Sequence, residues 1–472
     1  MDLRKKLDRL KEEKCEALLK QLGGSLRRAS ELPAQDDSRA APARNPDLKT
    51  ISAAELAALP RRKPTRSANL PGVEAMFPDG RMIEGETGAV FHRCTRLSPG
   101  DEDHPRGYAF ASFEGMGAWD ADALVALTND PEASIELEGW AFIDVETTGL
   151  GGGTGAFAFL VGVGYFADGG FTVEQFFMPD FPDERALLEA VAERMRDFRA
   201  LVTYNGKGFD APLLRSRFLL HRLRSAWEKP HWDLLHTCRR IWKRRLRDCS
   251  LGNIELEALG HAARSSDIPG AEIPAVYFDY VRGARRERMR KVFDHHAQDI
   301  LSLGALALRL LRIWRNAGEE LAHADDLTGL AGMHESRRDW AREGECLERA
   351  LLLERRPDAI YELSLRVAQC YKRQRRWNEA AEVWRAQMAN SACPGVRPHV
   401  ELAKYLEHRE RRFEEALTAT HAALRWVEGW MERRGWVQDG GGAEGLALER
   451  RLLLRRLARL ERKQQGMARD AS

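Results

Sequence analysis

Residues 140–149 read Trp-Ala-Phe-Ile-Asp-Val-Glu-Thr-Thr-Gly and carry the strongest structural signal in the chain. Aromatic and β-branched residues followed by a glycine turn signal are typical of a buried strand, which we expect over residues 139–145. Because alternate residues of a strand point to the same face, Asp144 and Glu146 should project together from a sheet. The two carboxylates of such a pair repel each other unless a divalent cation lies between them. The alternative explanation is that both acids lie at a strand end exposed to solvent.

The segments after this strand predict a mixed sheet with helices packed on it. Two apolar runs, 157–166 and 171–177, are joined by Ala-Asp-Gly-Gly, a connection typical of a hairpin. Helices and a strand then alternate, and their expected ranges are 184–197 (helix), 200–204 (strand), 210–221 (helix) and 289–314 (helix). Three hairpin-linked strands followed by alternating helices and strands are the order of an α/β ribonuclease-H-like fold.

Composition favours an intracellular protein with packed cores. A hydrophobic content of 43% is ample for several cores, and the net charge of +2 means that any basic surface for nucleic acid must be local. Seven cysteines without a CxxC pair fit reduced thiols rather than disulfides or a zinc site. The charged N-terminus lacks a signal-peptide core, and no run approaches the ~18 apolar residues of a membrane span. We therefore expect a cytoplasmic location.

The 472 residues suggest two or three domains, at roughly 150 residues each. We expect a charged helix and a flexible, partly disordered linker over residues 1–70, because this segment holds little to bury. Residues 71–136 contain turn signals and short apolar pieces, and they predict no definite structure. The ribonuclease-H-like domain should span 137–315, and an all-α repeat domain should span 322–465.

The expected C-terminal repeats rest on three aromatic residues. Trp340, Trp377 and Phe413 recur at intervals of 37 and 36 residues, and an alanine-bearing apolar turn follows each. Paired helices of the tetratricopeptide type pack in this way, and such repeats commonly bind a protein partner. An irregular helical bundle is the alternative.

A second acidic position follows the predicted strand 200–204. The loop Tyr204-Asn-Gly-Lys-Gly-Phe-Asp210 ends where the next helix begins, so Asp210 is either a helix cap or a ligand-binding acid. Loops at the carboxyl ends of strands are where α/β sheets bind ligands. This position favours a ligand-binding role for Asp210, and we predict that Asn205 and Lys207 in the same loop contact nucleic acid.

The third acidic position is on the predicted helix 289–314. His295 and Asp299 are four residues apart and share one face beside an apolar stripe, where they cost free energy unless paired or metal-bound. Adjacent surface histidines are the alternative for His295 and His296. Four carboxylates from these elements would suit two Mg²⁺ or Mn²⁺ ions, roughly 3.5–4 Å apart, rather than zinc.

A basic cluster surrounds Trp242 and is the candidate nucleic-acid surface. A solvated helix face is the usual explanation for such a run, but here the run is near the predicted metal site. Electrostatic capture of a phosphate backbone would suit that position. The residues we predict to bind nucleic acid are Arg239, Arg240, Arg244 and Arg245.

Five motifs in order resemble the YprB-like ribonuclease-H-like domain family of the DEDD exonuclease superfamily. They cover about residues 137–315: Phe142-Ile-Asp-Val-Glu-Thr-Thr-Gly-Leu150, Tyr204-Asn-Gly-Lys-Gly-Phe-Asp210, Trp232-Asp-Leu-Leu-His236, Ser250-Leu-Gly-Asn-Ile-Glu255 and His295-His-Ala-Gln-Asp-Ile300. The resemblance implies that Asp144, Glu146, Asp210 and Asp299 bind the metal ions. It also implies 3′-5′ exonuclease activity on a single-stranded end, with DNA and RNA equally open.

The resemblance leaves two points open. His295 lies where one branch of the superfamily has a tyrosine, with three residues before the last aspartate, whereas the histidine branch has four. We expect His295 to accept the proton of the attacking water, with His296 as the alternative. Asp233 should lie beside the site. A catalytically silent scaffold that binds nucleic acid or a protein through its repeats is the alternative function.

Overall fold

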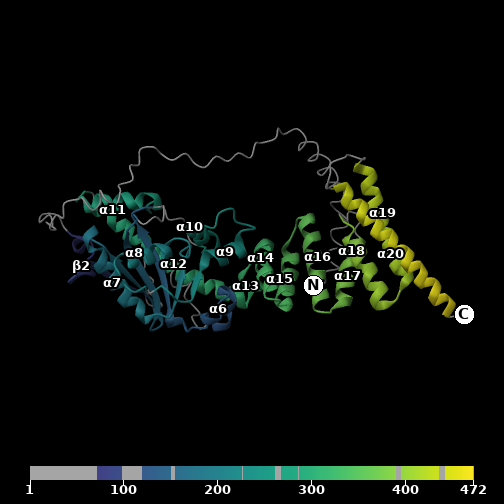
Figure 1. Cartoon of the computed structure of the whole chain (residues 1–472), viewed down its shortest axis with the longest axis horizontal. Helices are drawn as coiled ribbons and strands as arrows, with labels where there is room; N and C mark the ends of the chain where they lie inside the picture. The colour runs from purple at the N-terminus through teal and green to yellow at the C-terminus, as the bar shows by residue number, and fades with distance from the viewer. Residues whose placement is uncertain are drawn as a thin grey trace. The chain divides into compact units, whose positions relative to one another are not determined.

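The computed structural model describes residues 72–97, 120–149, 155–225, 227–260, 267–284, 286–389, 395–434 and 442–470 (Figure 1). The N-terminal helix and partly disordered linker predicted over residues 1–70 lie outside the described residues. The described chain divides into two compact units, and the change from one to the other falls between Leu353 and Glu354. Each unit is described by itself.

A seven-stranded mixed sheet forms the centre of the first unit. Its strands are β1 (Gly80–Gly85), β2 (Gly88–Leu97), β3 (Trp140–Thr147), β4 (Ala158–Ala167), β5 (Gly170–Phe177), β6 (Ala200–Thr203) and β7 (His231–Asp233). The spatial order is β1-β2-β5-β4-β3-β6-β7, antiparallel from β1 to β3 and parallel from β3 to β7. The predicted mixed sheet with flanking helices is therefore confirmed.

Strands β1 and β2 come from the segment whose sequence predicts no definite structure. Strand β2 pairs antiparallel with β5, so that Phe91 lies opposite Phe177. Both rings are fully buried, and each lies within about 6 Å of the ring of Phe293 on α12. Aromatic packing between distant segments therefore holds β2 on the sheet.

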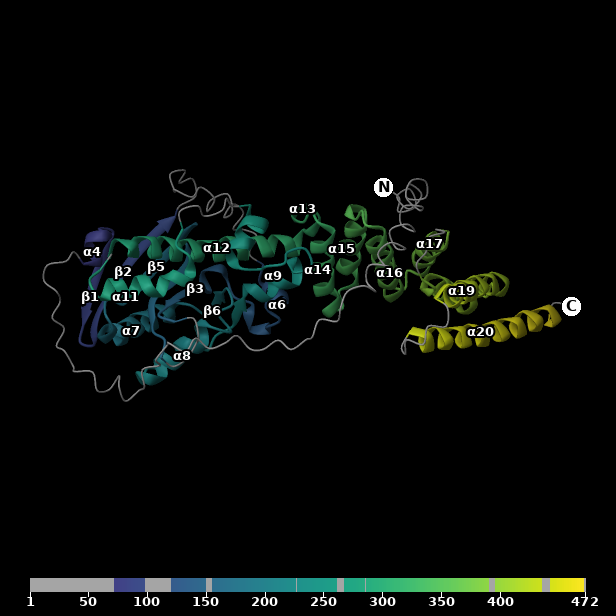
Figure 2. The ribbon, with the colours of Figure 1, turned by 90° about the horizontal axis from the view of Figure 1, so that it is seen from above.

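Helices cover both faces of the sheet. The α-helices that the structure describes in the first unit are α4 (Val73–Met76), α6 (Ala121–Thr128), α7 (Glu184–Arg194), α8 (Asp210–Leu220), α9 (Leu234–Trp242), α10 (Leu251–Ile254), α11 (Ile273–Val281), α12 (Met289–Arg315), α13 (Ala317–Glu320), α14 (Ala324–Ser336) and α15 (Trp340–Leu353). Figure 2 shows α12 on one side of the strands and α7 and α8 on the other. Helix α12 packs across β3, β4 and β5, and this contact positions the site.

Two glycines of β4 allow α12 to approach the sheet closely. A Cβ atom at Gly162 would lie 2.0 Å from Cδ1 of Ile300 and 2.5 Å from Cε1 of His296. A Cβ atom at Gly164 would lie 2.4 Å from Cγ2 of Ile300. Only glycine fits such a close approach, so the His-His-Ala-Gln-Asp segment of α12 lies directly against β4 and its neighbour β3.

Every regular element that the structure describes after residue 316 is a helix, which confirms the predicted all-α C-terminal region. The second unit contains α16 (Pro357–Arg373), α17 (Trp377–Met388), α18 (Arg397–Tyr405), α19 (Phe413–Arg434) and α20 (Gly442–Asp470). Trp340, Trp377 and Phe413 are the first residues of α15, α17 and α19. Among the described residues, no helix is both long enough and apolar enough to cross a membrane.

Candidate active site

Strand β3 presents Asp144 and Glu146 on the sheet face that carries α12. In the antiparallel register, Asp144 is opposite Gly162 and Glu146 is opposite Leu160, just before a bulge at Thr147. The Asp144 carboxylate lies 3.8 Å from Nε2 of His296, and the Glu146 carboxylate lies 4.0 Å from Nε2 of His295. The two acids therefore face the same helix, as the alternation of a strand requires.

Asp210 and Asp299 complete an acidic cluster with this pair. Phe209 occupies the N-cap position of α8 without a side-chain capping bond, and Asp210 is the first helical residue. Helix capping, the alternative role for Asp210, is therefore not its function here. Both Asp210 and Asp299 interact electrostatically with Asp144 and with Glu146. Four carboxylates from β3, α8 and α12 thus converge, although they are up to 155 residues apart in sequence.

Burial and neighbouring acids raise the pKa values of three of these carboxyl groups, those of Asp144, Glu146 and Asp210. Burial raises the pKa of Asp144 well above its usual range, and Asp299, Glu146 and Asp210 raise it further. The pKa of Glu146 is raised to about 8, chiefly by burial and then by Asp299 and Asp210 against the opposing effect of His295. Burial, with a contribution from Asp233, raises the pKa of Asp210 to about 7. The cluster therefore needs a compensating positive charge when ionised.

His295 lies between the carboxylates. Its Nε2 is 3.4 Å from Oδ2 of Asp299, and its Nδ1 is 2.8 Å from Oδ2 of Asp267. Burial by itself lowers the pKa of His295, but Asp299, Glu146 and Asp267 together outweigh it, so that the pKa is raised. The imidazole is thus held by acids on both of its nitrogens.

His296 is fully buried and supports the strand that carries Asp144. Its Nε2–H donates to the backbone carbonyl oxygen of Asp144 at 3.1 Å, and its Nδ1 accepts from Nε2 of Gln175 at 3.1 Å. Burial lowers the pKa of His296 to about 4, so the ring is neutral near pH 7. His296 is therefore not a surface residue, which was the alternative for it, and it contacts the backbone that carries Asp144.

Asp233 organises the loop that precedes α8. Its buried carboxylate accepts the backbone N–H groups of Asn205 at 2.8 Å and Lys207 at 3.0 Å, and it caps α9 through the N–H of Leu235 at 3.1 Å. Asn205 has a positive φ of 65°, a conformation that side-chain-bearing residues seldom adopt without such support. Asp233 therefore lies beside the acidic cluster, as its position in the sequence suggested.

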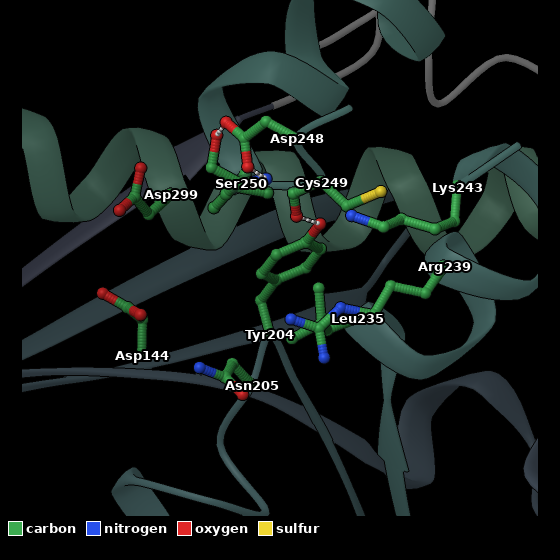
Figure 3. Close-up of a pocket in the computed structure, with 11 residues that line it drawn as sticks. Asp144, Tyr204, Asn205, Leu235, Arg239, Lys243, Asp248, Cys249, Ser250 and Asp299 are labelled. Carbon is green, nitrogen blue, oxygen red and sulfur yellow. Dashed lines mark hydrogen bonds between the residues drawn. The ribbon is translucent and has the colours of Figure 1, made fainter. Parts of the chain in front are cut away.

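A pocket of about 390 Å³ joins the acidic cluster to a basic wall (Figure 3). Asp144 and Asp299 lie on one side of it, and Arg239 and Lys243 lie on the other, with Tyr204 between them. Asn205 also lines the pocket, and the Lys207 side chain is exposed in the adjoining loop. The complete lining is Asp144, Tyr204, Asn205, Leu235, Arg239, Lys243, Asp248, Cys249, Ser250, Leu251 and Asp299.

The four arginines predicted to bind nucleic acid have different surroundings. Arg239 lines the pocket. Arg240 donates to Oγ of Ser336 at 3.0 Å, and Arg244 is 3.8 Å from Asp325. Arg245 donates through Nε to both oxygens of the buried Asp326, at 3.0 Å each, and through Nη1 to Glu257 at 2.8 Å. Arg240, Arg244 and Arg245 thus contact acids or hydroxyls of the protein itself.

The donor set fits a hard divalent cation. All four acids carry carboxylate oxygens, the ligand type that Mg²⁺ and Mn²⁺ prefer. Burial, and after it repulsion by neighbouring acids, raises the pKa of three of them, and a bound cation would offset both effects. The described side chains do not already form such a site, because no group of three or more His, Cys, Asp and Glu among them is arranged to hold an ion. His295 stands between Asp299 and Glu146 instead.

Several residues of the site had no role assigned from the sequence. Asp267 contacts His295, and Lys243 lines the pocket although it was not among the predicted binding residues. The buried Glu255 accepts from the hydroxyl of Ser302 on α12, one turn beyond Asp299. Glu255 ends one of the five motifs, which was a usable signal, whereas Asp267 stands outside all five.

The chain is similar to known proteins over part of its length. A model described as the RNase_H superfamily matches residues 141–311, a segment that contains all four acids of the cluster. The Bacillus subtilis (strain 168) protein YprB is 33% identical over 289 residues, which are 60% of this chain and 68% of YprB. A family B DNA polymerase from the hyperthermophilic archaeon Pyrobaculum calidifontis matches with 18% identity and a TM-score of 0.31, over 45% of this chain and 28% of the polymerase. The chain therefore belongs to the YprB family and contains a domain of the RNase_H superfamily.

Proposed function

We propose that this protein is a metal-dependent nuclease that hydrolyses phosphodiester bonds at the end of a single-stranded nucleic acid. The observation that carries the proposal is the convergence of four acids from β3, α8 and α12. Two of them, Asp144 and Asp299, line a pocket whose opposite wall carries Arg239 and Lys243. The RNase_H superfamily match over the same residues supports it. The 3′-5′ polarity is proposed on the resemblance of the five motifs to DEDD exonucleases.

In this proposal, Asp144, Glu146, Asp210 and Asp299 hold two Mg²⁺ or Mn²⁺ ions. When bound, such ions lower the pKa of a water molecule and offset the charge on the leaving oxygen. Nε2 of His295 accepts the proton of the attacking water, since it is the imidazole nitrogen nearest to Glu146 and Asp299. His296 is a less suitable base, because both of its nitrogens are engaged with Gln175 and the Asp144 backbone.

The basic wall binds the phosphates of the substrate. Arg239 and Lys243 line the pocket across from Asp144 and Asp299. A nucleic-acid strand whose terminal phosphodiester lies among the acids would therefore extend past both basic side chains. Asn205 and Lys207 are proposed to contact the nucleotides nearest the acids. Arg240, Arg244 and Arg245 contribute less, because they already contact Ser336, Asp325 and Asp326.

We further propose that the helices after residue 322 form tetratricopeptide-like pairs that bind a protein partner. The aromatic residues Trp340, Trp377 and Phe413 each begin the second helix of a pair. The pairs α14 with α15, α16 with α17, and α18 with α19 pack along their lengths. A pocket of about 350 Å³ lined by residues of α16, α17 and α18 offers one place for a partner to bind.

The activity is tested with single-stranded DNA and RNA oligonucleotides labelled at either end, in Mn²⁺ or in EDTA. We expect stepwise shortening from the 3′ end in Mn²⁺ and none in EDTA. Asp144→Asn and Asp210→Asn should abolish it, while Glu193→Gln, a change at an exposed carboxylate of α7, should not. Undiminished cleavage by Asp144→Asn, or no cleavage by the wild type with either nucleic acid, would exclude the proposal.

The basic wall is tested by the salt dependence of binding. Arg239→Ala and Lys243→Ala should each reduce the slope of log affinity against log salt by about 0.7, the loss of one contact to a single strand. Arg244→Ala is the matched control, since its side chain is exposed on the same segment and does not line the pocket. Equal effects of all three variants would mean that binding reflects a diffuse charge rather than this pocket.

The two histidines are separated by rate and stability. His295→Ala should lower the hydrolysis rate by roughly 10²–10⁴ with little effect on binding, the usual contribution of a positioned general base. His296→Ala should instead lower the melting temperature, because it leaves a buried cavity and removes the hydrogen bonds to Gln175 and to the Asp144 backbone. If the rate loss followed His296 alone in a protein of normal stability, the catalytic role would move to His296.

A further inference from the structure

Asp267 lies within hydrogen-bonding distance of His295. Its Oδ2 lies 2.8 Å from Nδ1 of the imidazole, whereas Nε2 is 3.4 Å from Asp299 and 4.0 Å from Glu146. The other oxygen of Asp267 accepts the backbone N–H of Ile268 at 2.8 Å. Each of the two side chains, Asp267 and His295, is about one-sixth exposed or less. Both partners are therefore held, and so is the orientation of the ring.

A carboxylate at one imidazole nitrogen selects the tautomer. An ionised carboxylate can only accept, so Nδ1 of His295 must carry a proton to bond Asp267. In the neutral ring, this leaves the lone pair on Nε2, which points towards Asp299 and Glu146. Without that preference, the neutral ring would place its proton on Nε2, next to the same two carboxylates, and could no longer accept one there.

The location of Asp267 also argues for a role beyond local structure. It lies on the segment before α11, 28 residues from His295, and caps neither α11 nor α12. Asp299, one helical turn from His295, would suffice for an ordinary ion pair on the helix surface. A second acid on the far nitrogen adds control of ring orientation.

We propose that Asp267 is a positioning residue that holds His295 as the Nδ1–H tautomer with Nε2 directed into the four-carboxylate cluster. The catalytic consequence rests on the proposed nuclease function, but the positioning itself does not. Outer partners of this kind typically change activity by about 10–100-fold when removed.

The first test determines the tautomer of His295 by NMR and does not depend on nuclease activity. Protein labelled with ¹⁵N-histidine is compared by long-range ¹H–¹⁵N spectra at a pH that leaves the ring neutral, with His295→Ala to assign the signal. The wild type should show the Nδ1–H pattern. The near-isosteric Asp267→Asn should lose it, because an amide can donate as well as accept. An unchanged pattern in Asp267→Asn would overturn the proposal.

The second test measures the rate and is built as a double-mutant cycle. Asp267→Asn should lower kcat by about 10–100-fold, with KM and Mn²⁺ affinity unchanged within threefold, and it should cost nothing further in the His295→Ala background. Asp267→Glu, which keeps the carboxylate, should recover part of the rate. Asp294→Asn, an exposed neighbour on α12, is the matched control. Fully additive losses of Asp267→Asn and His295→Ala would overturn the proposal.

The two tests separate this inference from the nuclease proposal. If the wild type cleaves and Asp267→Asn cleaves equally well, the inference fails and the nuclease function stands. If the wild type cleaves no nucleic acid, the nuclease function fails, while the tautomer spectra still decide whether Asp267 positions His295.

Discussion

Replacing Glu146 by glutamine should stabilise the metal-free protein. The pKa of Glu146 is raised from 4.5 to about 8 by burial and by neighbouring acids, so its ionised form is disfavoured in the fold. Each tenfold change in proton affinity corresponds to about 1.4 kcal/mol, so at pH 7 the carboxyl group costs the fold roughly 3 kcal/mol. Glutamine has nearly the same shape and no charge, and we expect the variant to recover about 1–3 kcal/mol.

The pH dependence gives the sign of this effect. Between pH 4.5 and about 8, the folded protein retains a proton on Glu146 that the unfolded chain has released. The free energy of unfolding of the wild type should therefore fall as the pH rises through this range. In Glu146→Gln this contribution is absent, so the two stabilities should be similar near pH 4 and diverge towards pH 8.

Metal ions should reverse the order of the two proteins. A ligand that binds only the folded state at a hundred times its Kd stabilises it by about 2.7 kcal/mol. Mn²⁺ should therefore raise the melting temperature of the wild type by several degrees and that of Glu146→Gln by much less.

The assay is thermal and urea unfolding between pH 4 and 9, with and without Mn²⁺. Glu193→Gln, whose carboxylate is 70% exposed, is the control and should stay within about 0.5 kcal/mol of the wild type. A Glu146→Gln variant that is less stable at pH 8, or that gains as much from Mn²⁺ as the wild type, would refute the view that Glu146 belongs to a repelling, cation-binding cluster.

Three further changes probe the packing around the site and the second unit. Gly162→Ala should destabilise the first unit by about 1–3 kcal/mol, because its Cβ would overlap Ile300 and His296; urea unfolding measures this, and Gly252→Ala, with no atom within 4 Å, should be nearly neutral. Arg245→Ala should cost about 3–5 kcal/mol by leaving the buried Asp326 unpaired, whereas Arg244→Ala should cost less than about 0.5 kcal/mol. Equal melting temperatures for these two variants would show that the Arg245 pair is not structural. Burial opposes ionisation of Glu407, but hydrogen bonds from Arg459 and Lys463 outweigh it and lower its pKa to about 2. Its contribution is present above pH 4.5 and lost as the pH falls towards 2, so Glu407→Gln should cost about 2–3 kcal/mol at pH 7 and little at pH 2, as measured by melting of the second unit.

Local patterns in the sequence were sufficient to predict the central elements. Strands β3, β4 and β5 have largely apolar runs separated by turn residues, and α12 has a helical apolar stripe, so each is encoded within a few neighbouring residues. The pairing of Asp144 with Glu146 on one face follows from strand alternation alone. Asp210 and Asp299 were found because each follows or lies within a motif of distinctive wording.

Contacts between distant segments lie beyond such patterns. The sequence marks strand β2 only by a short apolar run that ends at Phe91, because most of the residues after it are polar. The strand is therefore recognised mainly by its pairing with β5. The basic cluster around Trp242 could not be divided from its sequence into pocket and ion-pair residues, because the division depends on where α14 places Asp325 and Asp326.

The surroundings of the two histidines show the same limit. Adjacent residues on a helix point about 100° apart, so one of the pair must face away from the other's partners, but the periodicity does not say what it meets there. His296 is buried beneath Asp144 because Gly162 lacks a side chain. His295 contacts Asp267 because the fold brings a segment 28 residues earlier in the sequence next to α12. Strand alternation and the wording of short motifs, which are local, therefore sufficed to single out the four acids. The side chains that contact them depend on packing between elements and appear only in the folded chain.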